Sequence, residues 1–148
     1  MSLFNSLGIS ASALSAERVR MDVTAENLAN AQTTRTEAGG PYKRKEVVLE
    51  SAGRGGFAQA LAGAQGSASG GPAGGVKVAS ITEDSAPDRL VYDPSHPDAN
   101  ADGYVAMPNV NPVTEMVDLI TASRSYEANV TAMQTAKQMF NKTLDLLR

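Results

Sequence analysis

The chain has 148 residues and a formal net charge of −3 at pH 7, with no cysteine, no tryptophan, three phenylalanines and four tyrosines. Large core-filling side chains are therefore scarce, and the lack of cysteine excludes disulfides and cysteine-based metal or nucleophile sites. No basic stripe favours nucleic-acid binding, and no apolar run approaches the roughly 18–20 residues of a membrane-spanning helix.

Residues 2–30 are predicted to form a helix, because apolar side chains recur at every seventh position and such spacing aligns them along one stripe. A second row, whose members lie four residues after those of the first row listed below, holds Ala11, Arg18 and Ala25. Asn27 and Asn30, followed by AQTTRTEAGGP, predict where the helix ends. The first row consists of Leu7, Leu14, Met21 and Leu28.

Residues 31–111 are predicted to form a small β-rich domain. Segments 45–50, 76–81, 89–93 and 103–107 are rich in β-branched residues and partly alternating, which favours strands. Residues 51–75 are a Gly/Ala-rich, low-complexity sequence, which predicts a surface loop with at most a brief helical turn in FAQALAG.

Residues 112–148 carry the strongest pattern, which predicts a helix from Pro112 to Leu147 that would be about 54 Å long at 1.5 Å per residue. Asn111 is a predicted N-cap, Pro112 fits the first helical position, and Glu115 lies near the positive end of the helix dipole. Apolar positions alternate three and four apart for more than four heptads, as in coiled coils. One row is Leu119, Tyr126, Met133, Phe140 and Leu147, and its companion is Met116, Ser123, Val130, Lys137 and Leu144.

The stretch DANADGYV, residues 98–105, matches the first half of a helix–loop–helix calcium loop. The position that should supply a bidentate Glu is Asn109, and Pro94 and Pro97 stand where an entering helix is needed. We therefore favour a turn that feeds a strand, and keep a calcium- or ligand-binding secreted module, using residues 98–103, as the alternative.

No residue pattern predicts catalysis or a cofactor. His96, the single histidine, lies between prolines in DPSHPD, where a solvated loop residue is the simpler interpretation. Neither Gly-rich stretch fits a phosphate-binding loop. The basic cluster Lys43–Lys45 is interpreted as a solvated strand edge that resists unwanted pairing. We predict no enzyme activity, no cofactor, no metal and no small-molecule substrate.

The two terminal helices carry apolar seams that one small chain has difficulty burying. Ordering a long helix is costly in conformational entropy, and burial against one partner helix offsets this cost only in part. We therefore expect both ends to be poorly ordered alone and to become ordered by packing among many subunits. Arg18 and Lys137 interrupt the seams, where each either sets the register or extends to solvent.

The segment SALSAERVRMDVTAENLANAQT, built around NLAN and a following threonine, resembles the N-terminal signature of flagellar rod and hook proteins. The segments GGVKVASI, PDRLVYDPSHPDANADGYVAMPNVN and EMVDLITASRSYEANVTAMQTAKQMFNKTL are similar to the proximal members of the basal-body rod family. The resemblance covers nearly the whole chain. It implies motif residues Asn27, Leu28, Ala29 and Asn30 at the turn leaving the first helix, and Ser123, Arg124, Ser125 and Tyr126 on a face of the second.

This resemblance implies an elongated α+β structural subunit of the bacterial flagellar basal body. Its terminal helices, residues 1–30 and 112–148, would pair as a coiled-coil-like inner layer, with residues 31–111 as an outer domain. Its partners would be copies of itself and other rod proteins, with the inner-membrane ring or export gate as further candidates. It would reach the periplasmic space through the flagellar type III apparatus, consistent with an N-terminus that lacks the features of a cleavable signal.

Overall fold

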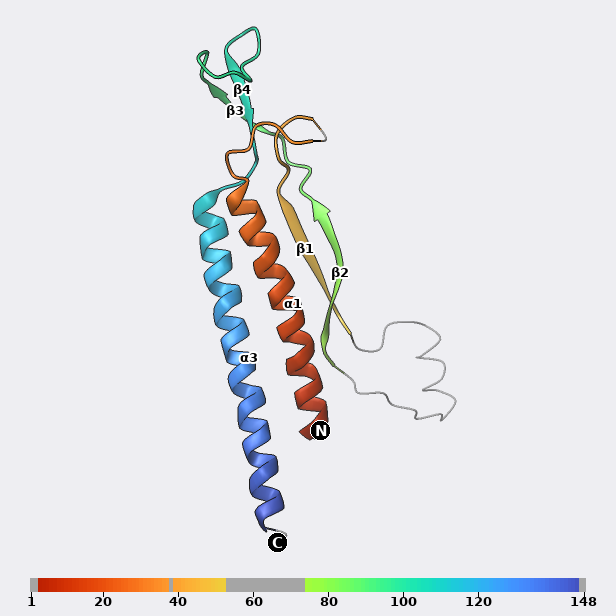
Figure 1. The fold of residues 1–148 in the computed structure, drawn as a ribbon. Helices are drawn as coiled ribbons and strands as arrows, with labels where there is room; N and C mark the ends of the chain where they lie inside the picture. Colours follow the sequence, from red (N-terminus) through yellow and green to blue (C-terminus); the bar gives the residue numbers. More distant parts are fainter. Residues whose placement is uncertain (1–2, 38, 53–73, 147–148) are drawn as a thin grey trace, which may run out of the picture. The chain divides into compact units, whose positions relative to one another are not determined.

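The computed structural model describes residues 3–37, 39–52 and 74–146. It divides into two compact units, each built from several stretches of the chain. Among the described residues, unit 1 comprises 3–19, 49–52, 74–79 and 123–146, and unit 2 comprises 20–48 and 80–122. In chain order, a long helix at each end of the chain flanks the strands of two small β-sheets (Figure 1), so the predicted α+β class is confirmed.

Helix α1 extends from Leu3 to Ala29, as the seven-residue pattern predicts. Asn30 ends it: its side-chain amide donates to the carbonyl oxygen of Glu26 at 2.9 Å, and its side-chain oxygen accepts from the Thr33 hydroxyl at 3.1 Å. The Glu26 carbonyl also accepts from the Asn30 backbone N–H at 3.0 Å, so both the side chain and the backbone of Asn30 bind the last turn of the helix.

Helix α3 extends from Pro112 to Leu146, and its start is the predicted one. The side-chain oxygen of Asn111 accepts from the Val113 N–H at 3.1 Å, while its carbonyl accepts from the Glu115 N–H at 3.0 Å. This is the geometry of an N-cap followed by proline at the first helical position. In unit 2 the beginning of α3 and the end of α1 run side by side in opposite directions (Figure 1).

Strands β1 (Lys45–Ser51) and β2 (Val76–Glu83) form one two-stranded sheet, close to the predicted segments. The pairing is antiparallel, because flanking hydrogen bonds join the Asp84 N–H to the Arg44 carbonyl at 2.7 Å and the Ala52 N–H to the Gly75 carbonyl at 2.8 Å. Most of the Gly/Ala-rich segment 51–75, FAQALAG included, lies outside the described residues.

Strands β3 (Arg89–Tyr92) and β4 (Tyr104–Met107) form the second sheet, an antiparallel pair whose register aligns Val91 with Val105. The rings of Tyr92 and Tyr104 meet edge to face with centroids 5.2 Å apart. Gly103 precedes β4 with φ of 81°, a conformation that glycine adopts without strain.

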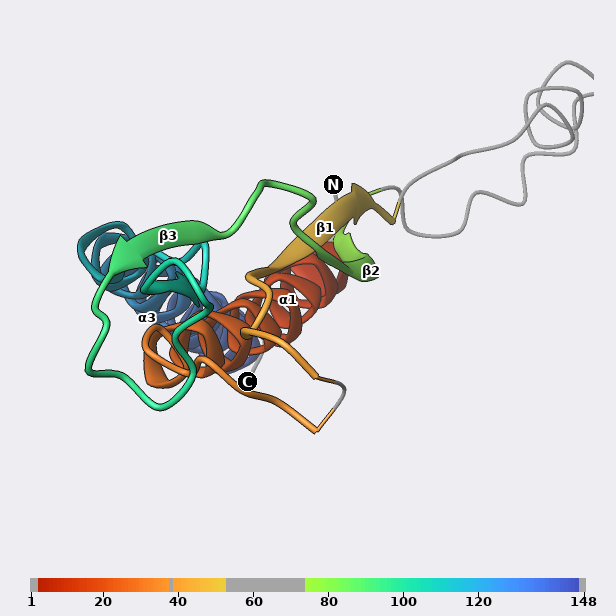
Figure 2. The ribbon, with the colours of Figure 1, turned by 90° about the horizontal axis from the view of Figure 1, so that it is seen from above.

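Buried apolar side chains are few and mostly small. In unit 2, Ala31, Tyr42 and Val110 form the core cluster. Ala122 on α3 is fully buried in unit 2, and Ala16 and Ala136 are buried in unit 1. Within unit 2, α1 lies between the beginning of β1 and the beginning of α3 in both Figures 1 and 2. This three-layer arrangement positions the site described next.

Candidate functional site

The predicted row of α1 is partly buried, and its predicted companion row is not. Leu7, Leu14, Met21 and Leu28 are all half-buried, whereas Ala11, Arg18 and Ala25 are exposed. The most buried positions of α1 lie on a different row, which consists of Ala16, Val23, Thr24 and Asn27. The predicted companion row, Arg18 included, is therefore exposed to solvent in the single chain.

On α3 the main predicted row is half-buried at Leu119, Tyr126 and Met133, while Phe140 is exposed and Leu147 lies outside the described residues. The companion row is displaced by one residue, because Glu115, Ala122 and Ala136 are buried at multiples of seven. The predicted companions are less buried: Val130 and Ser123 are half-buried, and Met116, Lys137 and Leu144 are exposed.

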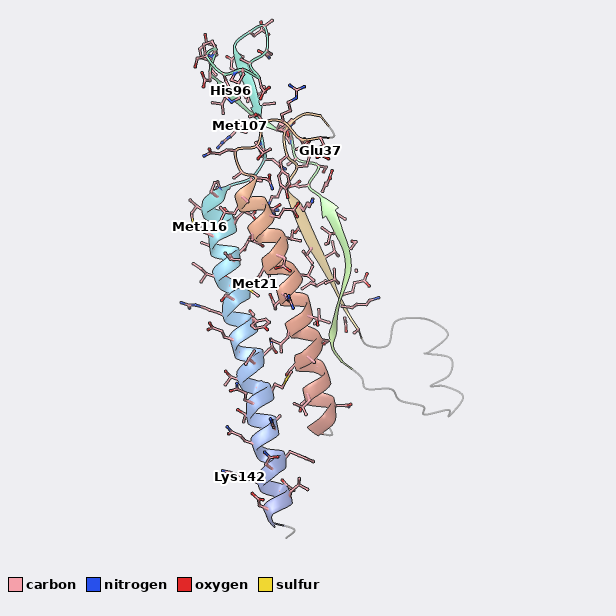
Figure 3. The ribbon with its side chains drawn as sticks, viewed as in Figure 1. Met21, Glu37, His96, Met107, Met116 and Lys142 are labelled. Atoms are coloured by element: carbon pink, nitrogen blue, oxygen red, sulfur yellow. The ribbon has the colours of Figure 1, made fainter. Side chains whose placement is uncertain are left out.

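Apolar side chains gather on the exposed surface of α3. Seven of the thirteen exposed large apolar side chains among the described residues belong to this helix. In unit 2 they follow a spacing of three and four, which places them on one stripe. Met116 lies on the side of α3 away from α1 (Figure 3). The stripe consists of Val113, Met116, Val117 and Ile120, exposed by 64%, 45%, 57% and 55%; we call it the α3 stripe.

Asn27, the first residue of the NLAN motif, is the centre of a buried polar network in unit 2. Only 1% of it is exposed. Its side-chain amide donates to the Lys45 carbonyl at 2.9 Å and to Glu115 Oε2 at 3.1 Å. Its side-chain oxygen accepts from the Tyr42 hydroxyl and from the Lys45 N–H, both at 2.9 Å. Asn27 thus joins α1 to β1 and to α3, and holds the backbone of Lys45 as a neighbouring strand would.

Glu115 is equally buried and has a charged partner. Its Oε1 accepts from Arg44 Nε at 2.7 Å. This hydrogen bond raises the pKa of Arg44 above its usual value, and the nearby carboxylates of Glu115, Glu46 and Asp84 act in the same direction against the effect of burial. Asp84 and Asp118 each lie 3.9 Å from the guanidinium. The carboxylate is therefore paired, as a buried charge must be.

The hydroxyl of Tyr42 donates into this network. Burial raises the pKa of Tyr42 to about 12, and the neighbouring carboxylates of Glu26, Glu115 and Glu83 contribute to the increase. Both effects disfavour the phenolate. Tyr42 therefore remains a hydrogen-bond donor to Asn27 across the ordinary pH range.

The basic cluster at residues 43–45 is paired, so its interpretation as a solvated strand edge is wrong. Lys43 Nζ lies 2.6 Å from Asp88, Arg44 is bound to Glu115, and Lys45 Nζ lies 2.6 Å from Glu26. Each cation reaches an acid from a different segment of unit 2. The sequence shows the three charges but not their partners, which are distant along the chain.

The second motif resemblance falls on the surface of α3. Ser123, Ser125 and Tyr126 are half-buried and Arg124 is exposed. The Ser125 carbonyl accepts from the Asn129 side chain at 2.9 Å. In the first motif, Asn27, Leu28 and Ala29 are still helical and only Asn30 lies in the turn. The structure thus gives the two asparagines of NLAN different roles: Asn27 binds other elements and Asn30 ends the helix.

The side chains of the 98–103 loop bond within the chain. Asn100 Oδ1 accepts from the N–H groups of Asp102 and Tyr104 at 3.0 and 2.9 Å, and Asp98 accepts from the Thr34 hydroxyl at 2.8 Å. His96, which lies in the same hairpin connection (Figure 3), accepts from the Asp98 N–H at 3.1 Å. These bonds are those of turns built around Asn and Asp, and the alternative of a calcium module gains no support.

Hydrogen bonds to Ser95 lower the pKa of Asp93, which precedes His96 in the same connection. In the described part of the chain, no group of three or more His, Asp or Glu side chains is arranged to hold a metal ion. Nor does any described helix combine the length and apolar character needed to cross a membrane.

Sequence reasoning missed Tyr42, Arg44 and Glu115 as members of a site. The sequence indicates for Glu115 only a place near the start of a helix. One residue could have indicated the site from the sequence. Asn27 is a polar residue within α1, at a position that the helix buries. Its partner Glu115 is 88 residues away in the chain, so spacing alone has no means of pairing them.

Comparison with known proteins gives the same assignment across the chain. A family model described as flagella basal body rod protein matches residues 7–35, and one described as flagellar basal body rod FlgEFG protein C-terminal matches residues 101–146. The flagellar basal-body rod protein FlgC of Bacillus subtilis (strain 168) is 55% identical over 150 residues, covering 99% of each chain.

Two further relatives have lower identity to this chain. The flagellar basal-body rod protein FlgC of Escherichia coli O6:H1 is 46% identical over 146 residues, covering 99% of this chain and 98% of the relative. The flagellar basal-body rod protein FlgC of Borreliella burgdorferi is 41% identical over 157 residues, covering 100% of this chain and 99% of the relative. The resemblance seen in the sequence is confirmed: this chain belongs to the FlgC family of flagellar basal-body rod proteins.

Proposed function

We propose that this chain is a structural subunit of the proximal part of the flagellar rod, and that it polymerises through its terminal helices into a helical tube. The observation that carries this proposal is the α3 stripe, Val113–Ile120, left exposed on a helix of a protein from a rod family. Exposed apolar side chains in a continuous row are typical of protein–protein interfaces.

The small residues of both helices support close packing between subunits. Ala11 and Ala25 on α1 are exposed, as are Ala128 and Thr131 on α3. Small side chains allow neighbouring helices to approach closely. Contacts that join different surfaces of successive copies generate an open helical assembly when the rotation does not close.

In this proposal the chain divides by role into an inner and an outer part. Residues 1–30 and 112–148 form the inner assembly domain, with Leu7, Leu14, Met21, Leu28, Leu119, Tyr126, Val130, Met133, Phe140, Leu144 and Leu147 as packing residues beside the α3 stripe. Residues 31–111 form the outer domain. The role is mechanical rather than catalytic, and the family assignment supports it.

The proposed partners are copies of this chain and other rod proteins, with the inner-membrane ring and the export gate as further candidates. The proposed location is the basal body in the periplasmic space, reached through the flagellar type III apparatus. Folding that is completed on docking would keep the chain export-competent and confine polymerisation to the growing tip.

Substitution of the α3 stripe tests the proposal. Val113→Asp with Ile120→Asp places two charges on the stripe, in a strain whose own copy of the gene is deleted. Both side chains are exposed in the single chain, so we expect unchanged circular dichroism of the purified protein, loss of the subunit from isolated basal bodies and loss of motility.

A matched control adds the same two charges one residue further along. Thr114→Asp with Thr121→Asp alters exposed polar positions with the same seven-residue spacing, and we expect a smaller loss of incorporation. Normal incorporation and swimming of the Val113→Asp, Ile120→Asp variant would contradict the assignment of the stripe to a subunit interface.

A further inference from the structure

We infer that the hydrogen bond between Asn27 and Glu115 fixes the register in which α1 lies against α3. Both residues are 1% exposed, their side chains meet at 3.1 Å, and both belong to unit 2. The inference concerns pairing within one chain and does not depend on the assembly proposal. It assigns to the two residues a positioning role that apolar packing cannot perform here.

Apolar packing cannot fix the register because both helices repeat at seven residues. The main row of α1 holds Leu or Met at each repeat, that of α3 holds Leu119, Tyr126, Met133 and Phe140, and alanines fill much of the buried row. An antiparallel pair displaced by one heptad therefore still brings apolar side chains opposite one another, although their sizes differ. A displacement of seven residues moves one helix by about 10 Å along the other.

Polar groups break this repeat. Asn27, Glu115 and Thr24 are the buried polar residues among those that the structure describes. In the observed antiparallel pair, Asn27 lies opposite Glu115. A displacement by one heptad in one direction would place Asn27 opposite Ala122. In the other direction it would place Asn27 opposite Pro108, which precedes α3. Ala122 offers no acceptor, so the Asn27 amide would lose a hydrogen bond in a buried position, which is unfavourable. One buried polar residue is a known means of fixing register in paired helices.

The rest of the network makes the correct register more favourable still. Glu115 Oε1 holds Arg44, which directly precedes β1 and whose carbonyl accepts from the N–H of Asp84, the residue that follows β2. Asn27 holds both backbone groups of Lys45, the first residue of β1. A displaced α3 would carry Glu115 away from Arg44 as well as from Asn27. Helix register and strand docking are therefore satisfied in the same arrangement.

Spin-label distances test the inference, since the chain has no cysteine of its own. Ala25→Cys and Val117→Cys place labels on exposed positions of α1 and α3 within unit 2. Distances are measured by pulsed electron resonance on the full chain in trimethylamine N-oxide, which favours compact states, at a concentration where circular dichroism has reached its helical plateau.

Three substitutions are compared on this background. Glu115→Leu removes the polar group, Glu115→Gln keeps an oxygen for the Asn27 amide, and Asp118→Leu removes a carboxylate one turn away that lies 3.9 Å from Arg44. We expect one narrow distance for the parent, Glu115→Gln and Asp118→Leu. For Glu115→Leu we expect a second population of at least about a tenth of the molecules, displaced as a heptad slip requires.

Each other result overturns the inference. A single parental distance for Glu115→Leu would mean that packing alone fixes the register. Loss of helicity in Glu115→Leu under the same conditions would mean that Glu115 contributes stability rather than register. Two distances for Glu115→Gln would remove the role assigned to the hydrogen bond with Asn27.

Discussion

At the scale of single residues, Asn27 uses its whole hydrogen-bonding capacity inside the protein. Two donors and two acceptor positions are all that a side-chain amide has, and all four are paired with Lys45, Tyr42 and Glu115. Asn30, three residues later, has the same chemistry but bonds in an exposed turn. The two asparagines of the NLAN motif therefore contribute differently to the stability of the fold.

Asn27→Ala is expected to open the start of β1. The Lys45 N–H loses its acceptor and Glu115 loses a donor, so we expect the Lys45 amide to exchange with solvent about a hundredfold faster, equivalent to about 3 kcal/mol of local stability. Amide exchange followed by NMR measures this. Asn30→Ala is the control and should leave the Lys45 amide unchanged; equal exchange in both variants would contradict the role given to Asn27.

Tyr42 makes the network sensitive to alkaline pH. An unfolded tyrosine ionises near pH 10, whereas the folded pKa is about 12. The neutral hydroxyl is favoured by folding, so its contribution to stability is complete below pH 10 and is lost as pH rises through about 12. The difference in absorbance at 295 nm between the wild type and Tyr42→Phe should therefore titrate with a midpoint near 12. A midpoint near 10 would show that the hydroxyl is not held as described.

At the scale of elements, the β3–β4 hairpin depends on one glycine. Gly103 has φ of 81°, and a Cβ there would lie 2.9 Å from Tyr92 Cε2 and 3.3 Å from Pro94 Cβ. The Tyr92 ring is itself paired with Tyr104 across the hairpin. A side chain at position 103 thus strains the backbone and displaces the aromatic pair.

Gly103→Ala is expected to destabilise the hairpin by about 2–3 kcal/mol, seen as faster amide exchange across β3 and β4. Gly40→Ala is the matched control, because Gly40 has φ of 79° but nothing within 4 Å of the added Cβ. Strain alone should cost about 1 kcal/mol there. If the two variants lose equal stability in their own loops, contact with Tyr92 and Pro94 is not the cause.

At the scale of the whole molecule, the small buried core limits what one chain can stabilise. The buried apolar residues that the structure describes are mostly alanine and valine, with Tyr42 the single aromatic. Small side chains gain little from burial, while two long helices cost much conformational entropy. Most helical stability in proteins comes from tertiary packing rather than from local preference.

The purified dilute chain is therefore expected to show weak helicity that rises when other rod proteins are added. Far-UV circular dichroism across a concentration series, with and without these partners, measures the change. Full helicity of the dilute monomer, with a sharp two-state thermal transition, would contradict the view that packing between subunits completes the fold.

The sequence by itself determined the kind, order and approximate ends of the helices and strands. Seven-residue spacing, the Asn111–Pro112 start and the runs of β-branched residues are local signals, and local geometry decides them. The motif resemblance determined the family. These predictions needed no knowledge of which segments meet.

Tertiary structure alone decided which helix rows are buried and which polar groups pair. Spacing favours the row that contains Met116 and Lys137, whereas the fold buries the row one residue earlier, at Glu115 and Ala136. The same holds for Arg44, whose partner Glu115 is 71 residues away. A buried charge is favourable only with its partner in place, and that condition exists only once distant segments have come together.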